Sequence, residues 1–121
     1  MRAQPSFGHE RLQVYQSSLE FFELTQILIT SLPPGHAHLA DQLKRASVSI
    51  CLNIAEGAGE FSKKEKARFY RISKRSATEC AAILDLFRRV QTNSERDLME
   101  AREKLFGIVS MLTALVKKLD G

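Results

Sequence analysis

The placement of its helix-breaking residues constrains the fold of this chain more than any other feature of the sequence. Proline and glycine together make up only nine of the 121 residues, and five of them lie in two clusters. The clusters are Pro33-Pro34-Gly35 and Gly57-Ala58-Gly59. Elsewhere apolar residues recur every three or four positions, which is the period of an amphipathic helix. Few breakers between long periodic runs predict an all-helical (all-α) protein.

The periodic runs predict four helices joined by short loops. We expect them over residues 10–30, 36–58 and 62–90, with a fourth that starts at Thr92 or Ser94. Pro33 and Pro34 cannot continue the hydrogen-bond ladder, so they end the first helix. Gly57 and Gly59 are expected to end the second in a left-handed cap. The third opens at Ser62 in a capping box.

Each predicted helix has an apolar face that we expect to point into the core. The expected core residues are Leu12, Tyr15, Leu19, Phe22, Gln26 and Ile29 in the first helix, with a second stripe at Phe21, Leu24 and Leu28; Leu39, Leu43, Ala46, Ile50, Ile54 and Gly57 in the second; Phe69, Ile72, Ser76, Cys80, Ile83, Phe87 and Val90 in the third; and Leu98, Ala101, Leu105, Ile108, Leu112, Leu115 and Leu119 in the fourth. Spacing of this kind is typical of helices that cross at shallow angles.

Four such helices with short loops predict one antiparallel up-down-up-down bundle. We expect a short N-terminal tail over residues 1–9 and a single bundle domain over residues 10–120. A chain of this length buries enough surface to fold without a disulfide or a metal. The second helix is also apolar on another side, at Val48, Leu52 and Ala55. We therefore expect a homo-oligomer in which other copies cover that surface.

Composition and spacing exclude several classes of protein. The apolar fraction is 44% and the charged fraction 26%, as in ordinary globular domains. No apolar run approaches the roughly 20 residues that span a bilayer, and no secretory signal is visible. We expect a cytoplasmic protein in which Cys51 and Cys80 are buried free thiols. We expect no metal or cofactor, because His36 and His38 point to different sides of their helix and lack partners at zinc-ligand spacing.

The basic residues concentrate in the third helix. Residues 62–90 hold nine basic and three acidic side chains, a net charge of +6, whereas the rest of the chain has a net charge of −2. A basic row on one face, about 16 Å long, could contact several successive phosphates. This basic row consists of Lys64, Arg68, Arg71 and Arg75. The candidate nucleic-acid-binding residues are Lys63, Lys64, Arg68, Arg71, Lys74 and Arg75. The alternative interpretation is a basic face that contacts only solvent.

A polar line follows the otherwise apolar second helix, and two polar residues of the third helix have matching spacing. The line consists of Gln42, Arg45, Ser49, Asn53 and Glu56, and the third helix adds Ser76 and Glu79. We interpret these residues as a buried structural network, in which Arg45 pairs with Glu79 or Glu56 because a buried charge needs a partner. Catalysis is not expected, since no nucleophile or histidine accompanies the carboxylates.

Three segments resemble motifs of a known family. They are Gln42 to Gly57 (QLKRASVSICLNIAEG), Phe69-Tyr70-Arg71-Ile72 and Ser76-Ala77-Thr78-Glu79-Cys80. They resemble the bacterial four-helix-bundle family that includes proteins encoded in intervening sequences of 23S ribosomal RNA genes. The resemblance extends from Leu12 to Leu119. The chain departs from the family at Glu60, where a basic residue is frequent, and at Arg75, where glycine is frequent.

The resemblance implies an assembly and a set of partners. It implies a homopentamer, with the bundles arranged as a barrel around a central channel. It also implies kinship with the accessory variability protein of diversity-generating retroelements, which binds a reverse transcriptase and nucleic acid. It implies no enzymatic activity.

Two functional hypotheses from different classes follow. In the first, the protein is a non-enzymatic oligomeric scaffold that binds nucleic acid through the basic face of its third helix, with RNA the favoured ligand and DNA the alternative. In the second, it is a homo-oligomeric adaptor that docks a protein partner, and the basic face has no direct nucleic-acid role. The salt dependence of binding separates them, because phosphate contacts weaken steeply as salt is added.

Overall fold

The computed structural model describes residues 6–90 and 95–121, and it is helical nearly throughout. A short 3-10 helix, η1 (Gly8–Arg11), precedes four α-helices. These are α1 (Gln13–Thr30), α2 (Ala37–Gly59), α3 (Lys63–Val90) and α4 (Glu95–Asp120). The described residues contain no strand. The prediction of an all-helical protein with four long helices is confirmed.

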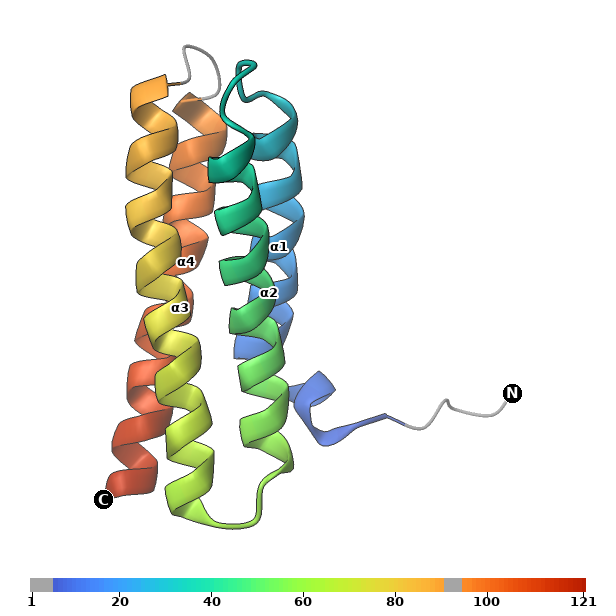
Figure 1. Ribbon diagram of the computed structural model, residues 1–121. Helices are drawn as coiled ribbons and strands as arrows, with labels where there is room; N and C mark the ends of the chain where they lie inside the picture. Colours follow the sequence, from blue (N-terminus) through green and yellow to red (C-terminus); the bar gives the residue numbers. More distant parts are fainter. Residues whose placement is uncertain (1–5, 91–94) are drawn as a thin grey trace.

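The helices form an antiparallel bundle in which each helix contacts those next to it in sequence, and α4 closes the ring against α1 (Figure 1). Within the described residues, neither diagonal pair, α1 with α3 or α2 with α4, makes contacts between backbones. α1 is the shortest of the four helices, and its N-terminal end does not extend as far as the loop that joins α2 to α3 (Figure 1). The bundle therefore has one end built from only three helices.

The core contains the expected faces of α2 and α4. In α2 every expected residue is buried, and in α4 the aliphatic seam is buried from Leu98 to Leu112. Leu115 and Leu119 are only partly buried. Both lie near the end of the bundle that α1 does not reach, which explains their exposure.

In α1 the expected core stripes are right only in part: Leu12, Tyr15, Leu24 and Ile29 pack against the core but are only partly buried. The buried residues are Val14, Ser18, Phe21, Thr25 and Leu28, of which only Phe21 and Leu28 belonged to an expected stripe. Ser18 and Thr25 are buried because their hydroxyls donate hydrogen bonds to carbonyl oxygens of their own helix, Tyr15 at 2.6 Å and Phe22 at 2.6 Å. A hydroxyl satisfied in this way loses little by leaving water.

In α3 the expected seam is wrong in its first half and right in its second. Tyr70, Ser73 and Ala77 are buried there, whereas Phe69, Ile72 and Ser76 are partly exposed. Small side chains at this contact let α3 approach α2 closely, and the Ser73 hydroxyl donates to the carbonyl oxygen of Ile50 at 2.9 Å. Further along the helix, Cys80, Ile83 and Phe87 are buried as expected.

The first three helices start one to three residues later than expected, whereas α1 and α3 end where they were expected to end. The first helix was expected from residue 10, but η1 occupies that place and α1 begins at Gln13. The Ser62 hydroxyl accepts a hydrogen bond from the backbone amide of Glu65 at 3.1 Å, as expected of a cap. The expected starts of the fourth helix, Thr92 and Ser94, lie outside the described residues.

Gly57 serves a purpose other than the left-handed cap that the sequence suggested. Among the described glycines only Gly35 has a positive φ, of 94°. Gly57 is buried inside α2, where a Cβ would lie 2.7 Å from Cε1 of Tyr70. Helix α2 continues to Gly59 and is capped by Glu60 in an extended conformation. The close approach of the Tyr70 ring, and not the backbone angle, requires glycine here.

We expect Gly57→Ala to lower the free energy of unfolding by about 1–3 kcal/mol, because the new methyl group overlaps the Tyr70 ring. Chemical denaturation measures this change. Gly59→Ala is the matched control, since a Cβ at Gly59 meets no atom within 4 Å. The control should be neutral or slightly stabilising. An equal loss in both variants would contradict the steric explanation.

Candidate nucleic-acid interface

The first half of α3 carries the basic row on its outer surface. All four members of the row have exposed side chains, as has Lys63, and Lys74 is partly exposed. Their spacing brings them to one face because residues three and four apart are neighbours on a helix. The structure therefore brings the sequence-predicted basic residues together on one accessible surface. We call the six residues Lys63, Lys64, Arg68, Arg71, Lys74 and Arg75 the basic face.

Two members of the basic face are already paired with carboxylates. The guanidinium of Arg68 donates to Glu65 through Nε at 3.0 Å and Nη2 at 3.3 Å, and it lies 4.4 Å from the centre of the Phe69 ring. Arg71 pairs with Asp120 at the end of α4. These side chains are about half exposed, and exposed ion pairs contribute little free energy. A phosphate can therefore compete for either arginine.

The remaining members of the basic face have no acidic partner among the described residues. They are Lys63, Lys64, Lys74 and Arg75. Lys64 and Arg75 stand at the two ends of the basic row, so the unpaired charges flank the paired ones. An unpaired exposed cation can neutralise a phosphate and so release a counterion condensed on the nucleic acid, which favours association.

Two lysines near this surface, Lys66 and Lys118, are not among the candidate nucleic-acid-binding residues predicted from the sequence. Lys66 donates from Nζ to the last carbonyl oxygens of α2, Gly57 at 3.3 Å and Ala58 at 3.0 Å. A cation is favourable there, because the carbonyls at a helix C-terminus carry partial negative charge. The Lys118 side chain lies near the start of α3, where the two helices form one hollow. The sequence feature that could have identified Lys66 is its position on the apolar side of α3.

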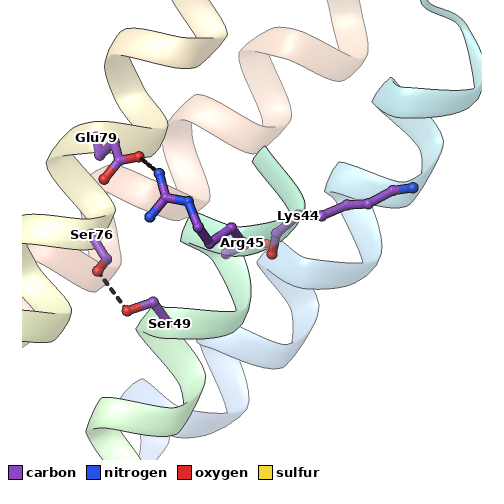
Figure 2. Close-up of polar contacts among 6 residues, drawn as sticks. Lys44, Arg45, Ser49, Ser76 and Glu79 are labelled. Carbon is purple, nitrogen blue, oxygen red and sulfur yellow. Dashed lines mark hydrogen bonds and ion pairs between the residues drawn. The ribbon is translucent and has the colours of Figure 1, made fainter. Parts of the chain in front are cut away.

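The polar line makes the expected ion pair, but the line is not buried. Arg45 Nη2 pairs with Glu79 Oε2 across α2 and α3 (Figure 2). The two side chains are 63% and 41% exposed, so the expected burial is wrong. The pair lies on the outer flank of the contact between these helices, where water reaches it.

Other members of the line lie closer to the contact. The hydroxyls of Ser49 and Ser76 are 2.9 Å apart, and Figure 2 shows them pointing toward each other. Asn53 Nδ2 donates to the carbonyl oxygen of Ser49 at 2.8 Å and to its hydroxyl at 3.1 Å. Gln42 and Glu56 are exposed and make no hydrogen bond to the described part of the chain. The line is thus a set of local contacts and not one network.

Groups capable of nucleophilic or metal chemistry are few. Cys51 and Cys80 are buried free thiols, as expected. Burial raises the pKa of the Cys51 thiol, and burial with the nearby Glu79 carboxylate raises the pKa of Cys80 to about 12. Both thiols therefore stay protonated and unreactive at neutral pH. Within residues 6–90 and 95–121, no three His, Cys, Asp or Glu side chains converge, and no helix is long and apolar enough to cross a membrane.

Two apolar surfaces face solvent on different parts of the bundle. A groove of about 390 Å³ lies between α3 and α4, and its apolar lining includes Ala81, Val109 and Phe106, which is 75% exposed. The second surface is the outer side of α2 at Val48 and Leu52, the latter 60% exposed. The described residues that line the groove all belong to α3 and α4, so the two surfaces share no residue.

Comparison with known proteins identifies relatives by sequence pattern and by fold. The family model of the 23S rRNA-intervening sequence protein matches residues 10–114. A crystal structure from Bacteroides thetaiotaomicron, of a protein with unknown function from the S23 ribosomal protein family, superimposes with a TM-score of 0.77 at 23% identity. The match covers 86% of this chain and 98% of that chain. No curated protein matches the chain.

We expect Arg45→Ala to lower the free energy of unfolding by less than about 1 kcal/mol, because the ion pair with Glu79 is exposed to solvent. A double-mutant cycle with Glu79→Ala should give a coupling of about 0.2–1 kcal/mol. Lys44→Ala is the control, since Lys44 points away from this pair (Figure 2). A loss of about 3–5 kcal/mol at Arg45 would indicate a desolvated pair instead.

Proposed function

The chain belongs to the 23S rRNA-intervening sequence protein family, and on this premise we propose that it is a cytoplasmic, non-enzymatic scaffold that assembles with copies of itself and binds RNA. The basic face of α3 would contact the RNA. The apolar surfaces of α2 and of the groove between α3 and α4 would hold the copies together.

The RNA-binding proposal rests on one observation: the positive charge is concentrated on one exposed helix surface. Residues 62–90 have a net charge of +6 while the rest of the chain is negative overall. The basic face holds six of these cations on the first half of α3, and four of them have no acidic partner in the described residues. Phosphate contacts of this kind position a nucleic acid without reading its bases. We therefore expect binding that depends weakly on RNA sequence.

The exposed apolar surfaces support self-assembly. Leu52 on α2 and Phe106 in the groove between α3 and α4 expose apolar area that a monomer would leave in water. A contact between two different surfaces is heterologous, and repeated heterologous contacts close into a ring when the rotation permits. We propose that the outer side of α2 in one copy occupies the groove of the next. Five copies per ring is the number that the family resemblance implies.

We expect Lys64→Glu with Arg75→Glu to lower the affinity for RNA at least about tenfold at low salt, because both unpaired cations of the basic row are reversed. The dependence of log affinity on log salt should become shallower by about 2, since each lost phosphate contact removes nearly one unit. Fluorescence anisotropy with RNAs of different sequence measures both quantities. Lys64 and Arg75 are preferable to Arg68 and Arg71 for this test. Arg68→Glu or Arg71→Glu would place a second negative charge against Glu65 or Asp120.

The control for this prediction reverses the same number of charges elsewhere. Arg89→Glu with Arg96→Glu changes two exposed cations at the opposite end of the bundle. This control should retain most of the RNA affinity. If the parent protein binds no RNA at physiological salt, or if both double variants lose affinity equally, the basic face is not the RNA-binding surface. The first of these results would favour the protein-adaptor hypothesis.

We expect Leu52→Glu and Phe106→Glu each to weaken self-association roughly 10- to 100-fold, which corresponds to the burial of one large apolar side chain. Light scattering coupled to gel filtration measures the mass of the assembly. Ile27→Glu is the control, because Ile27 is an exposed aliphatic residue on α1. Combining Leu52→Lys with Phe106→Glu should restore part of the assembly. A parent that remains a 13.7 kDa monomer at micromolar concentration would exclude the ring.

A further inference from the structure

A hollow of about 260 Å³ opens where α3 begins and α4 ends. It lies at the end of the bundle that α1 does not reach (Figure 1). Because no fourth helix covers this end, inward-facing positions of α3 and α4 remain accessible, and lysines can occupy them. The lining residues are Lys63, Lys66, Tyr70, Leu115, Lys118 and Leu119. We call this feature the end hollow.

The charges around the end hollow favour an anion. Lys63 and Lys118 are exposed and have no acidic partner among the described residues, whereas Lys66 is held by the carbonyl oxygens of α2. The nearest carboxylate in sequence, Asp120, is paired with Arg71. Among residues 6–90 and 95–121, no acidic side chain lines the hollow. Two lysine ammonium groups are thus available to one phosphate.

The walls of the end hollow favour a ligand with a flat apolar body. Leu115 and Leu119 are partly buried and line it together with Tyr70. Tyr70 is only 4% exposed, and its hydroxyl makes no hydrogen bond to the described residues. Most buried polar groups have a hydrogen-bond partner, so a bound group with a polar edge would supply the partner that this phenol lacks. An inorganic anion alone would neither pack on the two leucines nor bond the Tyr70 hydroxyl.

We infer that the end hollow binds one unpaired nucleotide of the RNA. Its phosphate would contact Lys63 and Lys118, its base would pack on Leu115 and Leu119, and the base edge would bond the Tyr70 hydroxyl. The inference rests on the proposed RNA binding. Lys63 adjoins Lys64, where the basic row starts, so a strand that follows the row reaches the hollow. Bases in a duplex are stacked and paired and cannot enter, whereas unpaired bases can be splayed out into such a site.

The experiment compares a single-stranded RNA with a blunt duplex of the same length by fluorescence anisotropy. Lys63→Gln with Lys118→Gln removes two charges at the end hollow, and Lys64→Gln with Arg75→Gln removes two from the basic row. We expect the first pair to weaken single-strand binding at least about tenfold and duplex binding much less. The second pair should weaken both alike. Equal effects of the first pair on both RNAs would overturn the inference.

Tyr70→Phe tests the hydroxyl by itself. Loss of one hydrogen bond should weaken single-strand binding about 2- to 10-fold, and duplex binding should not change. The free energy of unfolding should stay the same or rise, because the hydroxyl bonds none of the described residues. A variant with unchanged single-strand binding would contradict the role assigned to Tyr70 and the seating of a base beside it.

A mononucleotide separates this inference from the proposed function. Adenosine 5′-monophosphate should shift the methyl NMR signals of Leu115 and Leu119, while inorganic phosphate should leave them nearly unchanged. If the mononucleotide shifts these signals but the protein binds no RNA, the nucleotide site stands and the RNA scaffold fails. If RNA binds through the basic face while neither the mononucleotide nor a single-strand preference is seen, the scaffold stands and the end hollow is not a nucleotide site.

Discussion

The close contact between α2 and α3 is the interaction on which the other features depend. Gly57 admits the ring of Tyr70, and Ser73 bonds the backbone of Ile50 in α2. This contact is the most extensive in the bundle, and small residues make it possible because a larger side chain would separate the helices. It fixes the rotation of α3 about its axis, so that the basic row faces solvent.

The short α1 gives the bundle two unlike ends. Where all four helices run together, inward positions hold aliphatic and aromatic side chains. At the end that α1 does not reach, Lys66 takes an inward position of α3 and donates to the last carbonyl oxygens of α2. A lysine ammonium is tolerated there because water still reaches it and the helix C-terminus attracts it. The same opening leaves Tyr70, Leu115 and Lys118 lining one hollow.

The apolar period predicted the buried residues of α2 and α4 better than those of α1, and the reason is physical. In α2 and α4 most inward positions are aliphatic, so the periodic pattern identified them, although it missed the buried Ser47 and Cys51 of α2. In α1 the inward positions include Ser18 and Thr25, whose hydroxyls bond their own helix and so behave as small neutral groups. Arg45 pairs with Glu79, one of the two partners predicted, but its exposure was not predicted, because helical spacing does not say how far the neighbouring helix covers the flank.

The sequence by itself determined the four helices, their order and the concentration of positive charge on α3, because helix breakers, apolar period and charge are local properties of the chain. Only the tertiary structure decided which cations remain free. Arg71 is paired with Asp120, 49 residues away, while Lys63 and Lys118 meet at one hollow with no acid between them. Such encounters depend on the relative lengths of the helices and on their rotation against one another, and side-chain packing across the whole bundle sets both.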